Sequence, residues 1–413
     1  MTVRALRVQA ALVLLLTAGG ALPARAQEAV ETGFKVGNAR VHPQLDVAWG
    51  YDSAAGFFPT SPLAASNGLA PEWVARIRPG ARALLPTSIA DLSGGLTLDM
   101  VWLTGLLSPG SGSASRLLGE LNLGARFNPR GPFGFLVEER LVRSDRTGNP
   151  GAGLGVVSFR NDVRLSAPMK PGGGALEVVP AVAYGVELFS SIVSQDLPGC
   201  TDDALCKASG ASLSNFHNLR AELMGSYRFL PRTSLLLDSS FDGRSYFYDS
   251  GNPGALMLRA SAGIAGMLLP KVAGLVKVGY ARNFAGATNT VIGQLEASYL
   301  FNTRSSLQVG YLRNVDPTPT YGTLGDDRGY VGVNYALGEK LRLTGNLSFD
   351  YLTFGTSRAD MVFAAAPSAE YTVTRWLRAS VGYALTARST NASTLSTLNL
   401  LRHDVQLRAS MAW

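Results

Sequence analysis

The chain has 413 residues, of which 46% are hydrophobic, only 16% are charged and 46 are glycine. No apolar run of about 20 residues follows the first 26 positions, which excludes a helical membrane protein, and the many aliphatic and aromatic residues exclude a disordered chain. Three histidines and two cysteines leave little material for a metal site, so we expect neither a metal nor a cofactor. A glycine-rich chain of low charge with short apolar segments is typical of a transmembrane β-barrel.

The N-terminus has the pattern of a secretory signal peptide. Arg4 and Arg7 precede an apolar run over residues 10–17, and Ala24-Arg25-Ala26 supplies a small-x-small cleavage site. The apolar run is too short to span a bilayer, so we predict that residues 1–26 are removed after export. The formal charge of +7 then drops by three, because this segment contains three arginines and no acid.

Hydrophobic and polar residues alternate along most of the chain after Arg40, as in half-buried β-strands. Most of the alternating segments run ten to fifteen residues, and a tilted strand needs about 9–11 residues to cross a bilayer. We therefore predict an all-β fold, a single antiparallel up-and-down transmembrane β-barrel of about 18 strands. The segments are 41–51, 73–85, 89–103, 116–127, 133–144, 156–167, 175–189, 215–230, 234–248, 255–268, 272–283, 290–301, 306–315, 327–337, 341–354, 359–371, 376–386 and 399–413.

The connections between segments alternate in length. Tight turns such as Pro86-Thr87-Ser88 follow the even-numbered segments, whereas 52–72, 190–214 and 316–326 follow odd-numbered ones. Barrels of the bacterial outer membrane have short periplasmic turns and longer extracellular loops. We therefore predict a barrel over residues 41–413 in the outer membrane of a Gram-negative bacterium. Residues 27–40 are expected to form a short periplasmic segment before it.

The two cysteines, Cys200 and Cys206, fall in the long connection 190–214. Exported proteins meet an oxidising compartment, so a disulfide at the cell surface is the favoured interpretation. Metal binding would need further ligands, and His217 alone is a poor candidate.

The five tryptophans lie near predicted strand ends. We expect Trp49, Trp73 and Trp102 at the extracellular interface and Trp376 and Trp413 at the periplasmic one. Two aromatic girdles are what a barrel anchored in lipid requires, although sheet packing would explain any single aromatic residue. The terminal Trp413 also resembles the signal read by the outer-membrane assembly machinery, so that machinery and outer-membrane lipid are expected partners.

Charges on the strands are expected to face the lumen, since an arginine exposed to lipid near the midplane costs about 2–4 kcal/mol. A single inward arginine most simply pairs with a carboxylate. Along the second segment no acid alternates with the arginines, so a cationic track is weighed equally against neutralisation by acids such as Asp91. The lumen-lining candidates are Arg76, Arg78, Arg82, Arg160, Arg164, Arg402 and Arg408.

Other chemistries find little support in the sequence. His42, His217 and His403 lie on separate segments without an identifiable serine or cysteine partner, so we do not expect an enzyme. The positive charge is spread along the strands, which argues against nucleic-acid binding. The short segment 27–40 leaves no room for the plug domain of an energised siderophore-type receptor.

The first segment carries a family resemblance. Val41-His42-Pro43 followed by Trp49-Gly50-Tyr51-Asp52-Ser53 resembles the start of a β-barrel porin family linked to polysaccharide secretion, closest to exopolysaccharide-export porins of the Wzp type. Arg78-Pro79-Gly80-Ala81-Arg82 and Phe159-Arg160-Asn161 resemble the same family, whereas Ala54 replaces its usual asparagine. The resemblance implies an eighteen-stranded barrel that works with a periplasmic polysaccharide-export protein in a Wzx/Wzy-type pathway.

By this analogy we expect a monomeric, non-enzymatic conduit that exports a polysaccharide, such as an exopolysaccharide, a capsule or a spore coat. A diffusion porin for small solutes is the first alternative, and a plugged surface adhesin or structural barrel is the second. Conductance across a planar bilayer separates an open barrel from a plugged one. Loss of surface polysaccharide on gene deletion separates an exporter from a general porin.

Overall fold

The structure, a computed structural model, describes residues 33–57, 69–104, 114–145, 156–191, 215–247, 254–286, 288–318, 322–355, 358–391 and 399–413. The predicted signal peptide lies outside these ranges, and so do Cys200 and Cys206. Removal of the signal peptide and a disulfide between the two cysteines therefore stay predictions.

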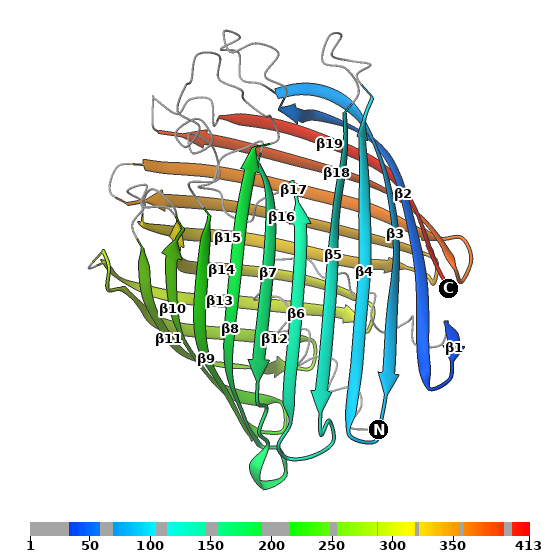
Figure 1. Ribbon diagram of the computed structural model, residues 1–413. Coiled ribbons are helices and arrows are strands. Elements are labelled where there is room, and N and C mark those ends of the chain that lie inside the picture. Colours follow the sequence, from blue (N-terminus) through cyan, green and yellow to red (C-terminus); the bar gives the residue numbers. More distant parts are fainter. Residues whose placement is uncertain are drawn as a thin grey trace.

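Eighteen long strands form a closed antiparallel barrel (Figure 1), which confirms the fold class and the strand number expected from the sequence. Each strand pairs with the next along the chain, and β19 closes the wall against β2. Strands on the near side of Figure 1 cross those of the far side at a steep angle, as tilted barrel strands do. The wall strands are β2 (Ala39–Phe57), β3 (Leu69–Pro86), β4 (Ala90–Leu103), β5 (Ala114–Phe127), β6 (Phe135–Ser144), β7 (Val156–Ser166), β8 (Leu176–Ser191), β9 (Phe216–Leu230), β10 (Thr233–Tyr246), β11 (Ala255–Leu269), β12 (Val272–Asn283), β13 (Thr288–Asn302), β14 (Ser305–Thr318), β15 (Gly322–Leu337), β16 (Leu341–Phe354), β17 (Arg358–Thr372), β18 (Leu377–Thr390) and β19 (Leu400–Ala412).

A short extra strand precedes the wall. β1 (Phe34–Val36) pairs antiparallel with residues 39–41 at the start of β2. The first wall strand thus begins at Ala39 rather than Val41, and part of the segment expected to be a plain N-terminal extension forms a hairpin with it. Gly37, at a φ of 61°, lies in the connecting turn, where an L side chain would be strained.

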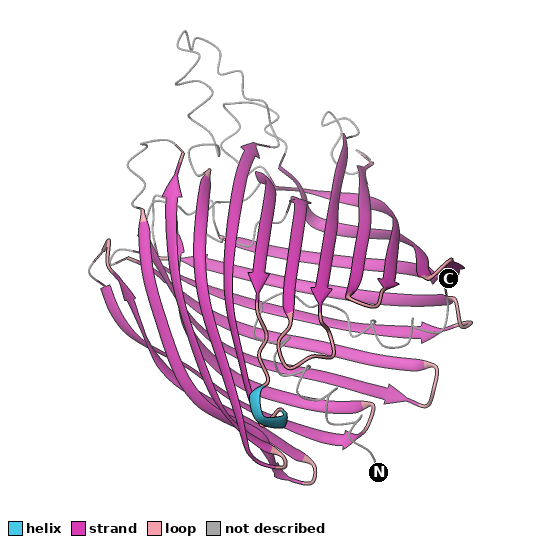
Figure 2. Ribbon diagram, turned by 60° about the horizontal axis from the view of Figure 1, so that its bottom comes forward, coloured by secondary structure: helices cyan, strands magenta, loops and turns pink. Residues whose placement is uncertain are grey.

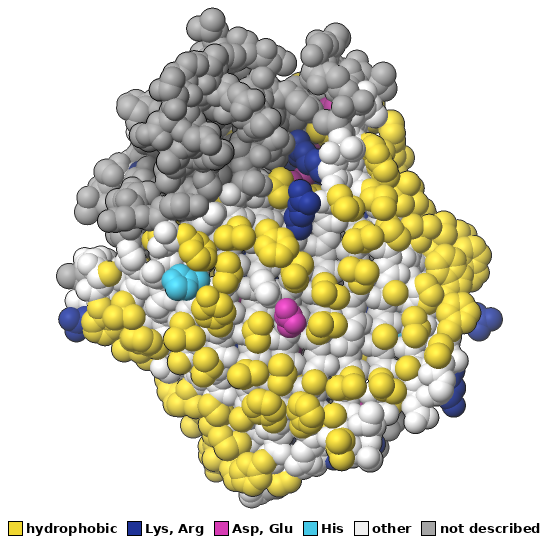
Figure 3. Space-filling model, in the orientation of Figure 1, with side chains coloured by type: hydrophobic (Ala, Val, Ile, Leu, Met, Phe, Trp, Pro, Cys, Tyr) yellow, Lys and Arg dark blue, Asp and Glu magenta, His cyan; other side chains and the backbone are white. Residues whose placement is uncertain are grey.

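The outside of the wall is hydrophobic, and this property assigns the protein to a membrane. Val278, Leu295 and Leu407 are 63%, 58% and 59% exposed, and similar side chains project from every wall strand on that face. Figure 3 shows the apolar side chains spread over the face that carries β4 to β9. A closed barrel satisfies its backbone hydrogen bonds within the wall, which the hydrocarbon core demands. The chain is an outer-membrane type of β-barrel.

Helical structure is minimal in the described ranges. Pro171–Gly173 forms a three-residue 3-10 turn at one end of the wall (Figure 2). No helix in the described part of the chain has the length and hydropathy to cross a bilayer.

The turns are short at one end of the wall, as the sequence predicts. β9 and β10 are joined by residues 231–232, and β11 and β12 by residues 270–271. The expected long loop 316–326 is wrong, however, because Pro317 pairs with Thr323 and Thr318 with Gly322, which leaves only residues 319–321. β2 and β3 likewise continue past the predicted ends of their segments. Backbone pairing needs no hydrophobic alternation, so the strands extend beyond the alternating segments from which they were predicted.

The seam between β19 and β2 closes the barrel. A Cβ on Gly50 would lie 2.1 Å from the carbonyl oxygen of Val405, so only glycine allows the two strands to approach here. Arg402 donates from Nε to Asp52 Oδ1 at 2.9 Å. At the other end of the seam, the amide of Trp413 donates to the Pro43 carbonyl at 3.1 Å.

We expect Arg402→Gln to destabilise the barrel. The substitution leaves the Asp52 carboxylate, which is only 5% exposed, with the amide of Ala54 as its remaining donor among the described residues. Orphaning one partner of a buried charged pair costs on the order of 1–3 kcal/mol. The urea midpoint of the folded barrel in detergent, read by its heat-modifiable gel mobility, should fall.

Arg160→Gln is the matched control for this variant. Arg160 pairs with Asp162 on its own strand and its side chain is 50% exposed, so its loss should cost about 0–1 kcal/mol. Equal midpoints for the two variants would contradict the role given to the seam.

Candidate functional site

The inner wall carries the charged side chains, because they alternate with the outward hydrophobic residues along each strand. All seven lumen-lining candidates occupy inward positions. Arg76, Arg78 and Arg82 lie on β3, Arg160 and Arg164 on β7, and Arg402 and Arg408 on β19.

The three arginines of β3 differ in whether they have an ion-pair partner. Asp99 of β4 lies 3.1 Å from Arg76 Nη1 and 3.0 Å from Arg78 Nε. Asp91, at the other end of β4, forms no ion pair with a described residue. One acid of the neighbouring strand thus pairs with two of the three arginines and offsets one of their two positive charges. The sequence of β3 alone could not reveal this contact.

Arg160, Arg164 and Arg402 have carboxylate partners. Arg160 Nε lies 2.6 Å from Asp162, and Arg164 Nη2 lies 2.8 Å from Glu222. Arg402 pairs with Asp52 across the seam. These pairs agree with the neutralising interpretation for single arginines.

Denser networks lie toward the ends of the strands away from the short turns. Asp360 is fully buried between Arg358 and Arg388, each with a nitrogen 2.6 Å away. Arg220 binds Asp242 at 2.7 Å. Arg358 and Arg388 fell outside the predicted segments, because both lie where the ladder continues beyond the hydrophobic alternation.

Three inward arginines form no ion pair or hydrogen bond with any residue that the structure describes: Arg82, Arg126 and Arg342. Arg82 lies four residues before the end of β3, Arg126 is the penultimate residue of β5, and Arg342 is the second of β16. All three therefore lie at the end that carries the short turns, which is the periplasmic end of such a barrel. We call them the periplasmic arginines.

Aromatic side chains lie mainly on the outside. Trp49 stacks on Trp73 with ring centroids 6.0 Å apart, and Trp376 on Trp413 at 6.4 Å, near opposite ends of the wall. Trp102 also lies on the outer face, 37% exposed. In the described part of the barrel the inward aromatic residues are few: Phe189, Phe216, Tyr246, Tyr330 and Phe354. All of these except Tyr330, which lies midway along β15, are at the end away from the short turns.

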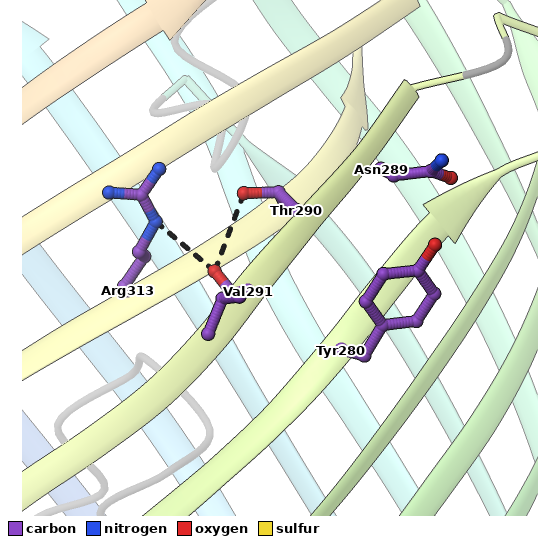
Figure 4. A pocket seen from close by; sticks show the side chains of 5 residues that line it. All are labelled: Tyr280, Asn289, Thr290, Val291 and Arg313. Carbon is purple, nitrogen blue, oxygen red and sulfur yellow. Dashed lines mark hydrogen bonds between the residues drawn. The ribbon is translucent and has the colours of Figure 1, made fainter.

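The expectation that every strand charge faces the lumen is wrong at several positions. Arg313 of β14 pairs with Asp327 of β15 at 3.2 Å on the outer wall, and Arg282 stacks on Phe284 there. Arg313 also donates to the Val291 carbonyl at 3.1 Å beside a shallow outer groove that includes Tyr280 (Figure 4). Glu139 and Arg143 of β6 project outward as well, because they pair in register with Leu123 and Gly119.

The histidines do not converge. His42 is buried on β2, His217 contacts Tyr184 and Phe247, and His403 lies 2.8 Å from the Tyr383 hydroxyl. Within the described ranges, no group of three or more His, Cys, Asp or Glu residues could hold a metal ion.

Comparison with known proteins adds only distant structural likenesses. No family model and no curated protein matches the chain. OccAB3 of Acinetobacter baumannii shares 9% identity over 92% of this chain and 100% of its own, with a TM-score of 0.48. OpdK of Pseudomonas aeruginosa, solved with vanillate, shares 12% over 90% and 98% (TM-score 0.48), and the siderophore receptor PirA of that species shares 7% over 91% and 80% (TM-score 0.49). The barrel assignment comes from the strand pairing described above.

We expect Asp99→Asn to increase the preference of the lumen for anions, because it removes the carboxylate shared by Arg76 and Arg78. In water, a unit charge about 6 Å from an ion changes the energy of that ion by about 0.7 kcal/mol. Before salt screening, this energy corresponds to a roughly threefold change in the local concentration of the ion. The zero-current potential in a potassium chloride gradient across a planar bilayer measures this change.

Asp327→Asn provides the matched control, since it removes the same group from the outer wall. Selectivity should stay that of the unaltered barrel. A shift toward cations in Asp99→Asn, or an equal shift in both variants, would contradict the inward placement of the Asp99 network.

Proposed function

We propose that this outer-membrane barrel is a passive, non-enzymatic diffusion channel for small water-soluble solutes, with a preference for anions. The observation that carries the proposal is the set of periplasmic arginines, which present free cations inside a wall whose other arginines are mostly paired. Free guanidinium groups attract carboxylates and phosphates weakly enough, in a wide aqueous lumen, for the solute to leave again.

The size of the wall supports an aqueous lumen. Strands about 4.8 Å apart and tilted by about 40° give eighteen strands a backbone radius of roughly 18 Å. Barrels of 16–18 strands leave a channel, whereas barrels of about eight fill with side chains. The charged ladder on the inner face needs water or partners, and the free arginines have no partner among the described residues.

The inner surface suits small charged solutes better than a sugar polymer. A glycan strand that slides through a pore is best supported by a track of aromatic faces that stack on its rings. The inward aromatic residues of the described barrel gather mostly at one end, and Phe189, Phe216 and Phe354 there are at most 5% exposed. The tryptophans lie outside, where they serve the lipid interface.

Polysaccharide export, together with a periplasmic polysaccharide-export protein, is the second candidate. It is favoured by the resemblance of the opening strand to a secretion-linked porin family. The motif has a role in this barrel that needs no polysaccharide, however. Asp52 binds Arg402 across the seam, and the Ser53 hydroxyl accepts a hydrogen bond from the amide of His403 at 2.8 Å. Asp52 and Ser53 of the shared motif thus serve barrel closure.

Proteoliposomes test the proposed function. Liposomes that contain the purified barrel should swell in isotonic solutions of small amino acids and monosaccharides, and faster for acidic amino acids than for basic ones of similar size. Absence of swelling from a folded barrel would indicate a plugged lumen and contradict the proposal.

Deletion of the gene separates the two candidates. A diffusion channel predicts unchanged surface polysaccharide and slower uptake of small anions. Loss of the polysaccharide, restored by the wild-type gene, would favour export and overturn the primary proposal.

A further inference from the structure

One carboxylate faces the lipid in the middle of a strand. Residues 138–140 of β6 are Glu138, Glu139 and Arg140, and alternation allows only two of three successive charges to face inward. Arg140 binds Glu120 at 3.0 Å and Glu138 lies 3.7 Å from Arg164, so both are inside. Glu139 is therefore forced outward.

The surroundings of Glu139 are apolar. It lies in register between Leu123 of β5 and Val163 of β7, midway along β6. Phe135 and Phe127 lie on its periplasmic side, and Phe159 lies opposite Arg143 on its extracellular side. Figure 3 shows one acidic side chain in the middle of the hydrophobic field on this face. Glu139 therefore lies at membrane depth, between the aromatic residues that mark the two interfaces.

Glu139 and its neighbour Arg143 differ from the other outward charges named above, because neither has an ion pair, a hydrogen bond or a stacking partner among the described residues. Arg313 and Asp327 pair with each other, and Arg282 stacks on Phe284. Glu139 makes no hydrogen bond or ion pair with any residue in the described part of the chain. An ionisable side chain inside a membrane costs free energy and normally marks a site with a partner.

A second polar group lies beside it. Asn161 of β7 is the register partner of Leu141, two residues along β6 from Glu139, and also faces outward. Its side-chain oxygen is buried without a hydrogen-bond partner in the described structure. Arg143 continues the same column. The outward patch of Glu139, Arg143 and Asn161 therefore offers a carboxylate acceptor, a cation and the amide nitrogen of Asn161 as a donor.

We propose that this patch is a subunit interface that docks a second copy of this chain. Copies in one membrane share their orientation, so a two-fold axis along the membrane normal brings each patch against itself at the same depth. The Asn161 amide and Arg143 guanidinium of one copy then supply donors, and the Glu139 carboxylate of the other accepts. The self-complementary charges favour a copy over an unrelated partner.

The rim of the patch suits close packing in a membrane. Leu117, Phe135, Phe159 and Leu165 surround it and are 51%, 43%, 38% and 42% exposed. Gly119, opposite Arg143, adds no side chain, so the surface is flat beside the guanidinium group. Polar groups within an apolar rim hold membrane interfaces together by interchain hydrogen bonds.

Cysteine cross-linking in isolated outer membranes tests the inference. In a chain with Cys200→Ser and Cys206→Ser, Leu141→Cys places a thiol in the patch between Glu139 and Arg143. A short bismaleimide should give a product of twice the monomer mass. Val333→Cys, outward on β15 at the opposite side of the wall, should give none.

The polar groups are tested in the same background. Glu139→Leu should reduce the Leu141→Cys product at least several-fold, whereas Glu139→Gln, which keeps an acceptor, should retain most of it. Heat-modifiable mobility confirms that each variant is folded. A folded monomer without cross-link, equal products at both cysteines, or an adduct of another mass would each overturn the inference. Cross-linking does not depend on conductance, so its result can contradict the subunit interface without bearing on the proposed channel function.

Discussion

The absence of water in the hydrocarbon core is the constraint on which this structure depends. Every backbone N–H and C=O at membrane depth must find its partner in the wall, so the sheet has to close on itself. Closure takes place where β19 meets β2, and Gly50 leaves the room that the approach requires. The Asp52–Arg402 pair then fixes the register across the seam. Residues that a family resemblance would assign to function thus have a structural task first.

Closure also decides where charge can lie. With the outer face given to lipid, charged residues gather inside, where side chains from neighbouring strands reach one another. Asp99 between Arg76 and Arg78, and Asp360 between Arg358 and Arg388, show that most of this charge stabilises the wall. What remains for a solute is the charge that the wall leaves without a partner, namely the periplasmic arginines. In the proposed channel, these unpaired arginines are the residues that select the solute.

The sequence predicted the membrane barrel well, because alternation with period two and turn residues are local properties. It predicted the strand number and most strand positions. It could not predict how far β2, β14 and β15 extend, since pairing above the membrane leaves no hydrophobic signal. Nor could it predict that Asp99 pairs with both Arg76 and Arg78, since that depends on the register between two strands. Glu139 could have been found, because three successive charges within a strand must place one outside.

The zero-current potential of single channels in a salt gradient tests the role of the periplasmic arginines most directly, when it is compared between the unaltered barrel and the triple variant Arg82→Gln, Arg126→Gln, Arg342→Gln. We predict an anion-selective wild-type channel and a variant that assembles normally, conducts and has lost most of this selectivity. A wild-type barrel that prefers cations, or a triple variant with unchanged anion selectivity, would contradict the claim that the periplasmic arginines select the solute.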